Sequence, residues 1–338
     1  MSQEIVLSVK NLSVVFHTPD GDVVAVNDVS FDLHSGETLG IVGESGSGKS
    51  VTASSIMRLN NSSTASTTGS IVVSGVDILS AGEDEVRRLR GSEVAMIFQD
   101  PLSALNPYYT VGKQIAEAYL VHHSDASKSE ARDVTLAMLK KVGIPNPEKR
   151  IDEYPHQFSA GMRQRIVIAI ALINDPKVLI ADEPTTALDV TVQAQILDLM
   201  RDLQSEFNMA IILITHDLGV IAEAAQDVLV MYGGRIVERS TVDALFSEPT
   251  HPFAWGLLGA VNSFETSGRG ALATIPGSPP SLIALPKGCA FHPRCEHASD
   301  VCRTEVPHLR EVGSQGSVSA CHLPDDQILQ LGRRVVLS

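Results

Sequence analysis

Short apolar runs separated by polar turns recur along most of the chain and predict its strands. Over residues 4–34, apolar and polar positions alternate on both sides of a turn at Thr18–Asp22, which indicates β structure. Compact apolar runs further along predict buried strands at Leu39–Val42, Ser70–Val73, Val94–Phe98, Val178–Ala181 and Ala210–Ile214. The glycine pair in the middle of Val228–Glu238 predicts a hairpin.

Between these runs, apolar residues recur at helical spacing. The predicted helices are Val51–Leu59, Glu83–Arg90, Thr110–His122, Lys128–Val142, Thr191–Phe207 and one that begins after Gly161. Strands that alternate with helices indicate an α/β core with a mostly parallel sheet. Because two of the helices stand between the runs at 94–98 and 178–181, we expect a helical subdomain over about residues 106–173.

Composition and charge narrow the class of protein. Lys and Arg total 26 against 40 Asp and Glu, a formal net charge of −14, which argues against nucleic acid as the main partner. The sequence contains neither a signal-peptide pattern at its start nor an uninterrupted apolar stretch of about 18 residues, so we expect a cytoplasmic chain. Beyond about Phe264 the composition shifts to Gly, Pro, Ser and Cys. We therefore expect one domain over residues 1–263 and a C-terminal extension over 264–338.

The apolar run Leu39–Val42 leads directly into GESGSGKS, residues 43–50, which fits the pattern G-x-x-x-x-G-K-[ST]. Glycines let backbone N–H groups approach phosphate oxygens, and the helix that follows adds its positive end. Lys49 can reach the β- and γ-phosphates, and the Ser50 hydroxyl can ligate Mg²⁺. A chance glycine-rich turn is the alternative, but a strand before and a helix after favour a site for a nucleoside triphosphate. Its expected nucleotide-binding residues are Gly43, Ser45, Gly46, Gly48, Lys49, Ser50 and Val51.

A second set of candidate residues stands at the ends of predicted strands. Asp182 could hold Mg²⁺, and Glu183 could orient or deprotonate a water that attacks the γ-phosphate. His216 could hydrogen-bond that phosphate, and Gln99 could bind Mg²⁺ or water, although a lone His or Gln is more often structural. Phe16 could stack on an adenine ring or simply belong to the core.

The segment Phe158–Arg165, FSAGMRQR, resembles the signature segment of ATP-binding-cassette (ABC) ATPases, usually written LSGGQ. The family's other parts occur in the expected order: Phe16, the phosphate loop, Gln99, the signature, Asp182–Glu183, Ala187-Leu188-Asp189 and His216. The resemblance implies a P-loop NTPase cassette of the α/β class. Such a cassette has a mostly parallel core sheet, an antiparallel β subdomain and a helical subdomain, here with a small Cys-containing C-terminal extension.

The resemblance also implies a mechanism. Two cassettes would pack head to tail, with each ATP between the phosphate loop of one and the signature of the other. Ser159 and the N–H of Gly161 would meet the partner's γ-phosphate, Asp189 would belong to the same nucleotide site, and Glu183 with His216 would support hydrolysis. Ala160 replaces the usual signature glycine, so we expect the site that this chain donates to its partner to be weakened.

Several stretches are similar to those of oligopeptide/dipeptide importers: Met96–Pro107, Ala181–Gln195, His251–Phe253, Ile275–Pro280 and Leu285–Cys289. This similarity implies the ATP-hydrolysing subunit of a membrane importer, located on the cytoplasmic face of the inner membrane. The implied partners are a second ATPase subunit, expected to be a paralogue, two transmembrane permease subunits and an extracytoplasmic peptide-binding protein. Peptide specificity is implied by the resemblance alone.

All four cysteines, Cys289, Cys295, Cys302 and Cys321, fall after residue 288, with the spacing C-x5-C-x6-C-x18-C. Disulfides are disfavoured in a reducing cytoplasm, so four thiolates suit either an iron–sulfur cluster or a structural Zn²⁺. The spacing lacks the tight C-x2–4-C pair that is usual for zinc, and related importer subunits carry a [4Fe–4S] cluster here. We therefore expect the cluster, with Zn²⁺ and unligated thiols as alternatives.

Other functions stay open at this point. A soluble ABC ATPase that acts on ribosomes or nucleic acid usually has two cassettes or a long coiled-coil insertion, whereas this chain has one cassette and a short insertion. An importer of nickel or glutathione is a further alternative. A P-loop kinase is disfavoured by the signature segment. Two polytopic membrane proteins among the purified partners would favour transport, and ribosomes would favour the soluble ATPase.

Overall fold

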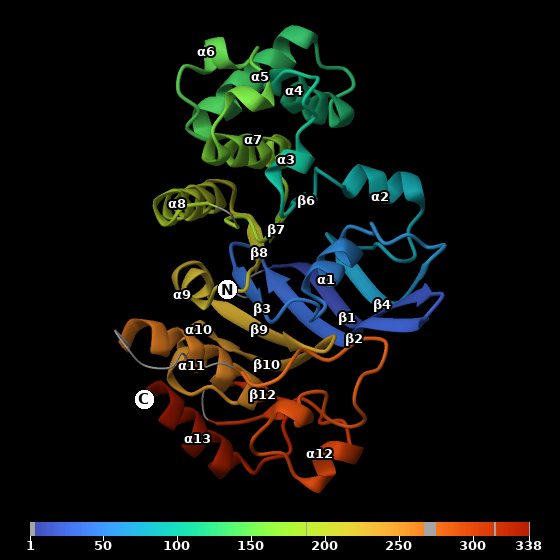
Figure 1. The fold of residues 1–338 in the computed structure, drawn as a ribbon. Coiled ribbons are helices and arrows are strands. Elements are labelled where there is room, and N and C mark those ends of the chain that lie inside the picture. The colour runs from blue at the N-terminus through green and yellow to red at the C-terminus, as the bar shows by residue number, and fades with distance from the viewer. Residues whose placement is uncertain (1–3, 187, 267–274, 314–315, 338) are drawn as a thin grey trace. The chain divides into compact units, whose positions relative to one another are not determined.

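The computed structural model describes residues 4–186, 188–266, 275–313 and 316–337. The chain divides into two compact units. The first unit consists of Met1–Leu7, Asp32–Glu37 and Val72–Ile212, and the second of Ser8–Phe31, Thr38–Ile71 and Leu213–Ser338. Figure 1 gives the element labels used below. Within the described residues, no helix is both long and apolar enough to cross a lipid bilayer.

Buried apolar strands form the sheet of the first unit. Strand β6 (Val94–Ile97) runs parallel to β7 (Val178–Asp182), with Met96 opposite Ile180. All residues of β7 and of β8 (Ala210–Ile214) are buried, as expected for parallel strands covered on both faces. The chain passes from the first unit to the second within β8.

Helices make up most of the rest of this unit. They are α2 (Glu83–Leu89), α3 (Pro101–Ala104), α4 (Val111–His122), α5 (Lys128–Lys141), α6 (Pro147–Arg150), η1 (Pro155–Gln157), α7 (Ala160–Leu172) and α8 (Val190–Phe207). Helix α5 shows how the sequence sets their limits. The Ser127 side chain caps it by accepting a hydrogen bond from the N–H of Glu130, and it ends just before Gly143, whose φ is +75°. Its buried face includes Met138 and Leu139, and it packs with α4 and α7.

The second unit contains a mixed sheet whose strands follow the order β11-β12-β10-β9-β3. Strands β3 (Thr38–Val42) and β9 (Asp227–Tyr232) are parallel, whereas β9 and β10 (Arg235–Thr241) form an antiparallel hairpin with an irregularity between Ile236 and Glu238. Two short strands from the C-terminal region, β12 (Val318–Ser319) and β11 (Arg310–Glu311), continue this sheet by antiparallel pairing.

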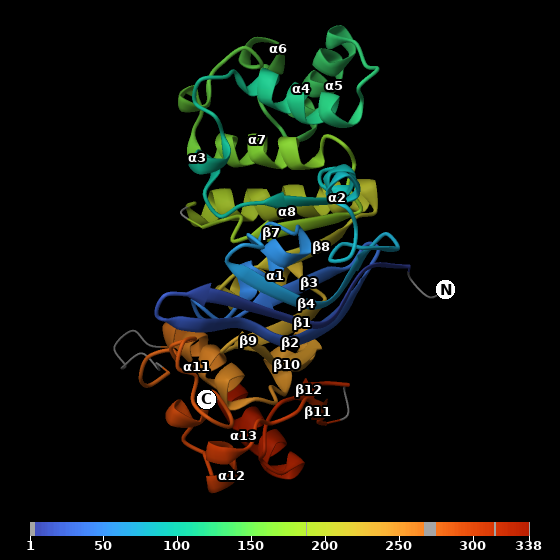
Figure 2. The ribbon, with the colours of Figure 1, turned by 90° about the vertical axis from the view of Figure 1, so that its right-hand side faces the viewer.

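A separate β layer holds the start of the chain. Figure 2 shows β1 (Ile5–Thr18) and β2 (Gly21–His34) side by side with β4 (Ala65–Val73), and a short β5 (Val76–Asp77) pairs antiparallel with the end of β4. This layer is the antiparallel β subdomain. Helix α1 (Lys49–Ile56) follows β3.

The C-terminal region has its own small core. The helical elements that follow β8 are α9 (Leu218–Ala224), α10 (Val242–Ser247), α11 (Pro252–Thr266), η2 (His292–Arg294), α12 (Asp300–Thr304) and α13 (Asp325–Leu337). Helix α13 packs on α11, and Trp255, Val312 and Ile328 form a buried cluster between these segments. No strand or helix after residue 263 was predicted from the sequence. The strands β11 and β12 and the helical turns η2 and α12 are too short to show a periodicity, whereas the 13-residue helix α13 was missed.

The strands and helices predicted for the first two thirds of the chain are confirmed, with differences at their ends. The largest difference is β4, which begins at Ala65, five residues before the apolar run that predicted it. In its first half only Ala65 is buried, and the Ser, Thr and Gly residues that follow it carry little hydrophobic signal. The mixed core sheet, the antiparallel β layer and the helices of the first unit agree with the expected fold class.

One carboxyl group is buried completely in the second unit. Glu238 on β10 accepts hydrogen bonds from the N–H groups of Thr250, at 3.0 Å, and His251, at 2.8 Å. Burial raises the pKa of Glu238 from 4.5 to about 7 despite these donors. Burial lowers the pKa of His251 to about 3. As the pH rises, Glu238 therefore decreases the free energy of unfolding, whereas His251 increases it.

We predict a pH-dependent difference in stability between the wild-type chain and Glu238→Gln. An acid that binds its proton more tightly when folded contributes stability that is complete below about pH 4.5 and is lost as the pH rises to about 7. The unfolding free energy of the wild type, minus that of the variant, should therefore fall by about 3 kcal/mol across this window. Urea unfolding of both chains from pH 4.5 to 8 measures it, and the His251 effect cancels because both chains contain it. A difference that does not vary with pH would contradict the assignment.

Candidate active site

The phosphate loop spans Gly43–Gly48 and connects the buried strand β3 to helix α1. Two of its glycines have positive φ and no room for a side chain. A Cβ on Gly43 (φ +156°) would lie 2.3 Å from the Met231 carbonyl oxygen, and one on Gly48 (φ +104°) would lie 2.6 Å from that of Ala25. The loop therefore needs glycine at both positions, which agrees with the tight backbone expected from the motif.

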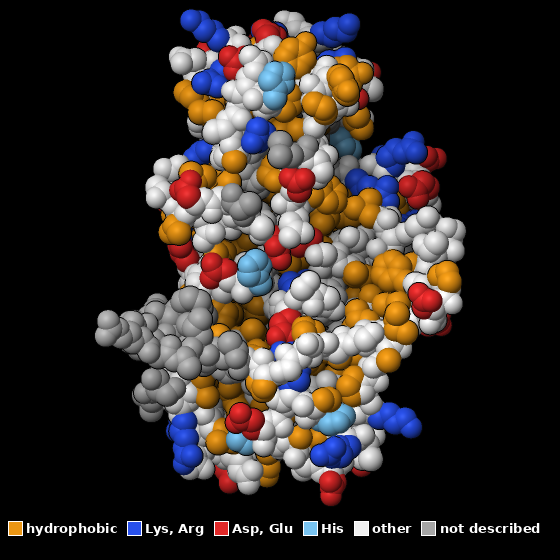
Figure 3. Space-filling model, in the orientation of Figure 1, with side chains coloured by type: hydrophobic (Ala, Val, Ile, Leu, Met, Phe, Trp, Pro, Cys, Tyr) orange, Lys and Arg blue, Asp and Glu red, His pale blue; other side chains and the backbone are white. Residues whose placement is uncertain are grey.

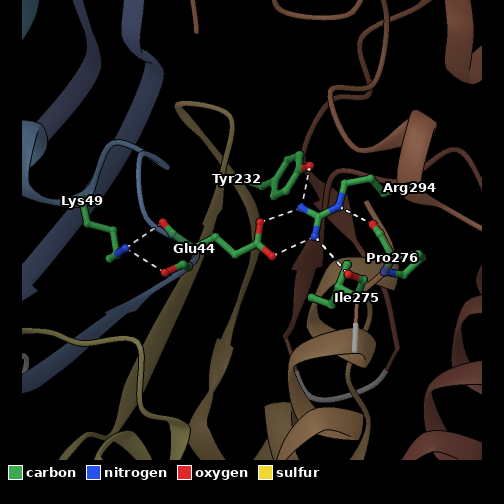
Figure 4. Close-up of polar contacts among 7 residues, drawn as sticks. Glu44, Lys49, Tyr232, Ile275, Pro276 and Arg294 are labelled. Atoms are coloured by element: carbon green, nitrogen blue, oxygen red, sulfur yellow. Dashed lines mark hydrogen bonds and ion pairs between the residues drawn. The ribbon is translucent and has the colours of Figure 1, made fainter. Parts of the chain in front are cut away.

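Lys49 is the first residue of α1, and its side chain is buried against the loop. Its Nζ donates hydrogen bonds to the carbonyl oxygens of Gly43, at 2.7 Å, and Glu44, at 2.9 Å (Figure 4). The ammonium and the N-terminus of α1 together place positive charge at this loop. Ser45 and Gly46 are exposed within the loop, and Ser50 and Val51 follow in the first turn of α1.

Two further candidates belong to the same unit. Phe16 is half-buried near the end of β1, and His216 is exposed just after β8. The next residue, Asp217, caps α9 by accepting a hydrogen bond of 2.8 Å from the N–H of Gly219. This cap fixes the backbone that carries His216.

The first unit brings Gln99 and Glu183 together. Gln99 follows β6 and Glu183 follows β7, so the parallel pairing of these strands places both residues at one edge of the sheet. The Glu183 carboxylate accepts hydrogen bonds from Gln99 Nε2 and Thr186 Oγ1, both at 2.9 Å. Asp182, the last residue of β7, is buried beside them.

The backbone at Glu183 is unusual because its φ is +49°, in the left-handed region that non-glycine residues seldom adopt. Such a conformation costs about 1 kcal/mol or more. The sequence showed the acidic pair but neither this backbone turn nor the contact of Glu183 with Thr186. A threonine three residues after a glutamate has no distinctive pattern.

The signature segment forms the start of α7. Ser159 caps the helix by accepting a 3.3 Å hydrogen bond from the N–H of Met162, and Ala160 is its first residue, with an exposed side chain. A Cβ on Gly161 would lie 2.7 Å from Cγ1 of Val192 on α8, so this glycine permits close packing of the two helices. Figures 1 and 2 show α7 and α8 side by side.

Asp189 caps α8 by accepting a 2.9 Å hydrogen bond from the N–H of Val192. Val192 in the first turn of α8 therefore contacts both the signature glycine, Gly161, and the cap residue Asp189. The sequence did not reveal this contact. Ala187, which belongs to the expected Ala187-Leu188-Asp189 motif, lies outside the described residues.

The four cysteines are free thiols, and all are half-buried. The backbone N–H of Cys289 donates a 2.8 Å hydrogen bond to the carbonyl oxygen of Cys302. Burial, together with a smaller effect of the neighbouring thiols, raises the pKa of Cys295 to about 11 and that of Cys321 to about 12. Within the described parts of the chain, no three His, Cys, Asp or Glu side chains are grouped so that they could hold a metal ion. This geometry therefore gives no evidence for the expected cluster or for zinc.

Comparison with known families identifies two matching regions. Residues 26–186 match the family described as "ABC transporter", and residues 237–302 match "Oligopeptide/dipeptide transporter, C-terminal region". The second match includes three of the four cysteines.

Curated relatives match nearly the whole chain. The "Oligopeptide transport ATP-binding protein OppD" of Escherichia coli is 51% identical, covering 96% of this chain and 95% of the relative. The "Dipeptide transport ATP-binding protein DppD" of Lactococcus lactis is also 51% identical, over 92% of this chain and 89% of the relative. The OppD protein of Bacillus subtilis is 50% identical over 95% of this chain and 89% of its own length.

Solved structures resemble the cassette part. The dimeric post-hydrolysis structure of the ATP-binding cassette MJ0796, bound to ADP and Pi, gives a TM-score of 0.62 at 25% identity and covers 70% of this chain and 98% of that one. CbiO1 from Clostridium perfringens gives a TM-score of 0.61 at 27% identity, over 72% of this chain and 92% of that one. The fold, the motifs and the full-length relatives agree: the chain is an ABC ATPase, the ATP-binding subunit of an importer of the oligopeptide/dipeptide transporter family.

Proposed function

We propose that this chain hydrolyses ATP at sites shared with a second cassette and uses the resulting closure and opening to drive peptide import. The observation that carries this proposal is the Glu183 carboxylate, which Gln99 and Thr186 hold directly after the buried Asp182. A carboxylate in a fixed orientation beside a second carboxylate suits one as general base and the other as metal ligand. The names of the relatives support peptides as the substrate class.

ATP binding would change the partners of Lys49. Its ammonium now neutralises the dipoles of two loop carbonyls, so a triphosphate in the loop would offer it stronger, charged acceptors. The N–H groups of the loop and of the first turn of α1, from Gly43 to Val51, would face the phosphate oxygens. Phe16 would stack on the adenine ring.

The proposed magnesium ligands are Ser50, Gln99 and Asp182, whose hydroxyl, carbonyl and carboxylate oxygens are the donors that Mg²⁺ prefers. Gln99 uses its amide nitrogen toward Glu183, so its carbonyl oxygen is the atom offered to the metal. When bound, Mg²⁺ supplies charge neutralisation at the β- and γ-phosphates.

In the hydrolysis step, Glu183 would accept a proton from the attacking water. The water oxygen would bond to the γ-phosphorus, and the bond between that phosphorus and the oxygen bridging it to the β-phosphate would break. Gln99 and Thr186 would fix the carboxylate by their hydrogen bonds. His216 would donate a hydrogen bond to the γ-phosphate.

A second cassette, expected to be a paralogue, would complete each site. Ser159 and Asp189 are exposed at the beginnings of α7 and α8, and Gly161 and Val192 hold these two helix starts together. A surface of this kind can present N–H groups to a phosphate of the partner's nucleotide. The similar MJ0796 cassette is dimeric in its solved structure.

The helical part of the first unit offers a surface for the permease subunits. Its groove of about 700 Å³ is lined by Tyr109, Lys113 and Leu120 among others, and Tyr108 is 84% exposed nearby in the sequence. Figure 3 shows hydrophobic side chains at the surface of this part, next to Lys and Arg. We propose that one permease segment docks here, which places the chain on the cytoplasmic face of the membrane. An extracytoplasmic binding protein would deliver the peptide.

We also propose that the four cysteines hold a [4Fe–4S] cluster, with Zn²⁺ as the alternative. The support is chemical: all four cysteines follow residue 288 in the sequence, and four thiolates are the ligand set that such clusters use. Gly288, with φ +72°, lets the Cys289 loop approach the Cys302 backbone, since a Cβ there would lie 2.4 Å from the Cys302 carbonyl oxygen.

Glu183→Gln should keep ATP binding but reduce hydrolysis by about 100-fold or more, because the amide cannot accept the proton of the attacking water. ATP turnover and nucleotide-dependent dimerisation of the purified chain with its partner cassette measure this, and the variant should remain dimeric with ATP. The matched control is Glu85→Gln, an exposed glutamate on α2, which should retain wild-type turnover. Unaltered hydrolysis in Glu183→Gln would rule out the assigned base.

Ala160→Gly should raise the ATP turnover of the full transporter roughly threefold, which corresponds to about 0.7 kcal/mol in the activation barrier. The methyl group is exposed at the start of α7, so its removal relieves contact with the partner's nucleotide without creating a cavity in this chain. ATP affinity at this chain's own phosphate loop is the internal control and should not change. Equal turnover in the two transporters would remove the hypothesis.

The cluster proposal predicts about four iron and four sulfide ions per chain after anaerobic purification of the intact transporter. Cys321→Ser should lose both, together with the brown absorbance, because one of the four ligands is gone. Iron, acid-labile sulfide and zinc analyses of the two preparations are the measurement. Stoichiometric zinc, or no metal at all, would exclude the cluster, and identification of the co-purified subunits tests the partners in the same sample.

A further inference from the structure

An arginine from the C-terminal region reaches the phosphate loop. Arg294 ends the short helix η2, directly before Cys295, and Glu44 is the second residue of the loop. Arg294 Nη1 lies 2.6 Å from Glu44 Oε2, and Nη2 lies 2.9 Å from Oε1 (Figure 4). The two parallel bonds form a bidentate ion pair, the geometry in which Arg recognises a carboxylate most strongly.

The remaining donors of the guanidinium hold other segments of the second unit. Nε donates to the Pro276 carbonyl oxygen at 2.8 Å, Nη2 also donates to that of Ile275 at 3.4 Å, and Nη1 donates to Tyr232 Oη at 3.2 Å. Arg294 therefore fastens the start of the C-terminal extension and the end of β9 to the same loop residue. Only 6% of its side chain is exposed, and 23% of the Glu44 side chain.

The backbone around Arg294 is fixed by an aromatic cluster. Phe291 is buried and packs against Tyr232, with ring centroids 5.1 Å apart, and against Phe253, at 5.5 Å. The N–H of Arg294 donates to the Phe291 carbonyl oxygen at 3.0 Å. Because this core holds the arginine in place, the ion pair constrains Glu44 more than it constrains Arg294.

Glu44 also touches the lysine that is central to nucleotide binding. Its backbone carbonyl oxygen accepts the 2.9 Å hydrogen bond from Lys49 Nζ, while its carboxylate binds Arg294. One residue thus connects the C-terminal cation with the phosphate-binding ammonium. Pro279 and Pro280 line a small space next to Glu44, so the C-terminal segment also lies against the loop by packing.

The burial of Arg294 distinguishes this contact from an ordinary surface ion pair. Exposed pairs contribute little, because solvent screens them and their side chains are flexible. When a buried pair loses one partner, however, the other charge is left without compensation. Loss of Arg294 would thus leave the Glu44 carboxylate without its cation, only two residues from the exposed Gly46.

We propose that Arg294 is a positioning residue for the phosphate loop, and that through Glu44 it makes nucleotide affinity dependent on the C-terminal region. The inference rests on the proposed role of this loop in ATP binding. It gives the C-terminal extension a function in the ATPase cycle, because any change that displaces η2 also releases Glu44. Arg294 needs no contact with nucleotide for this role.

The test compares MgATP binding by full-length Arg294→Gln, Glu44→Gln and wild-type chains. Both variants should raise the Kd and the KM for ATP about tenfold with kcat nearly unchanged, an effect within the usual range of coupling between linked sites. The double variant should be no worse than either single variant, because both substitutions remove the same ion pair. Arg294→Lys, which keeps the charge but loses the two-pronged geometry, should lie between wild type and Arg294→Gln.

The matched control is Arg303→Gln, an exposed arginine on α12, which should bind ATP like the wild type. If Arg294→Gln fails to fold, Glu44→Gln decides, because it leaves the bonds of Arg294 to Ile275, Pro276 and Tyr232 in place. Unchanged Kd and KM in a folded variant, even one with a lower melting temperature, would overturn the proposal and leave Arg294 a purely structural role.

Lys49→Ala separates this proposal from the function of the loop itself. Loss of ATP binding in Lys49→Ala, with unchanged binding in Arg294→Gln and Glu44→Gln, would remove the inference alone. Full ATP binding in Lys49→Ala would overturn the nucleotide role of the loop and the inference with it.

Discussion

The close approach of backbone to backbone at the phosphate loop is the constraint on which the rest of the structure depends. Gly43 and Gly48 lie so near the carbonyl oxygens of Met231 and Ala25 that a single methyl group would not fit. The loop is thereby packed against β9, which carries Met231, and against β2, which carries Ala25. Lys49, buried at the start of α1, satisfies two of the carbonyls. An ammonium that is already desolvated and held close to the loop can exchange those carbonyls for phosphate oxygens with little reorganisation.

Much of this arrangement could be predicted from the sequence because it is local. The strand before the loop, the glycines and the following helix are contiguous, and the fully buried strands β7 and β8 appear as uninterrupted apolar runs. The same holds for Ser159 and Asp189, which each precede a helix and cap it. Motif order then identified the family, which the full-length relatives confirmed.

What the sequence did not show is the pairing of residues far apart in the chain. The bond between Gln99 and Glu183 depends on β6 and β7 being neighbours, and the packing of Gly161 on Val192 depends on the angle between two helices. The strands β11 and β12 are two residues long and exist only because β10 offers an edge for pairing. Such features arise from tertiary contacts rather than from local propensity. The role of Arg294 could not be predicted either, because it depends on a contact with Glu44, 250 residues away, and the sequence around Arg294 contains no motif that indicates it.

The ion pair between Glu44 and Arg294 also has a consequence for the order of biosynthesis. The two residues are 250 positions apart, so at about 5–20 residues per second the ribosome needs roughly 12–50 s to add the arginine after the glutamate. Throughout that interval the nascent loop is complete in sequence but lacks its cation. A newly made cassette therefore acquires its finished loop only after the segment that carries Arg294 and the first cysteines has emerged from the ribosome.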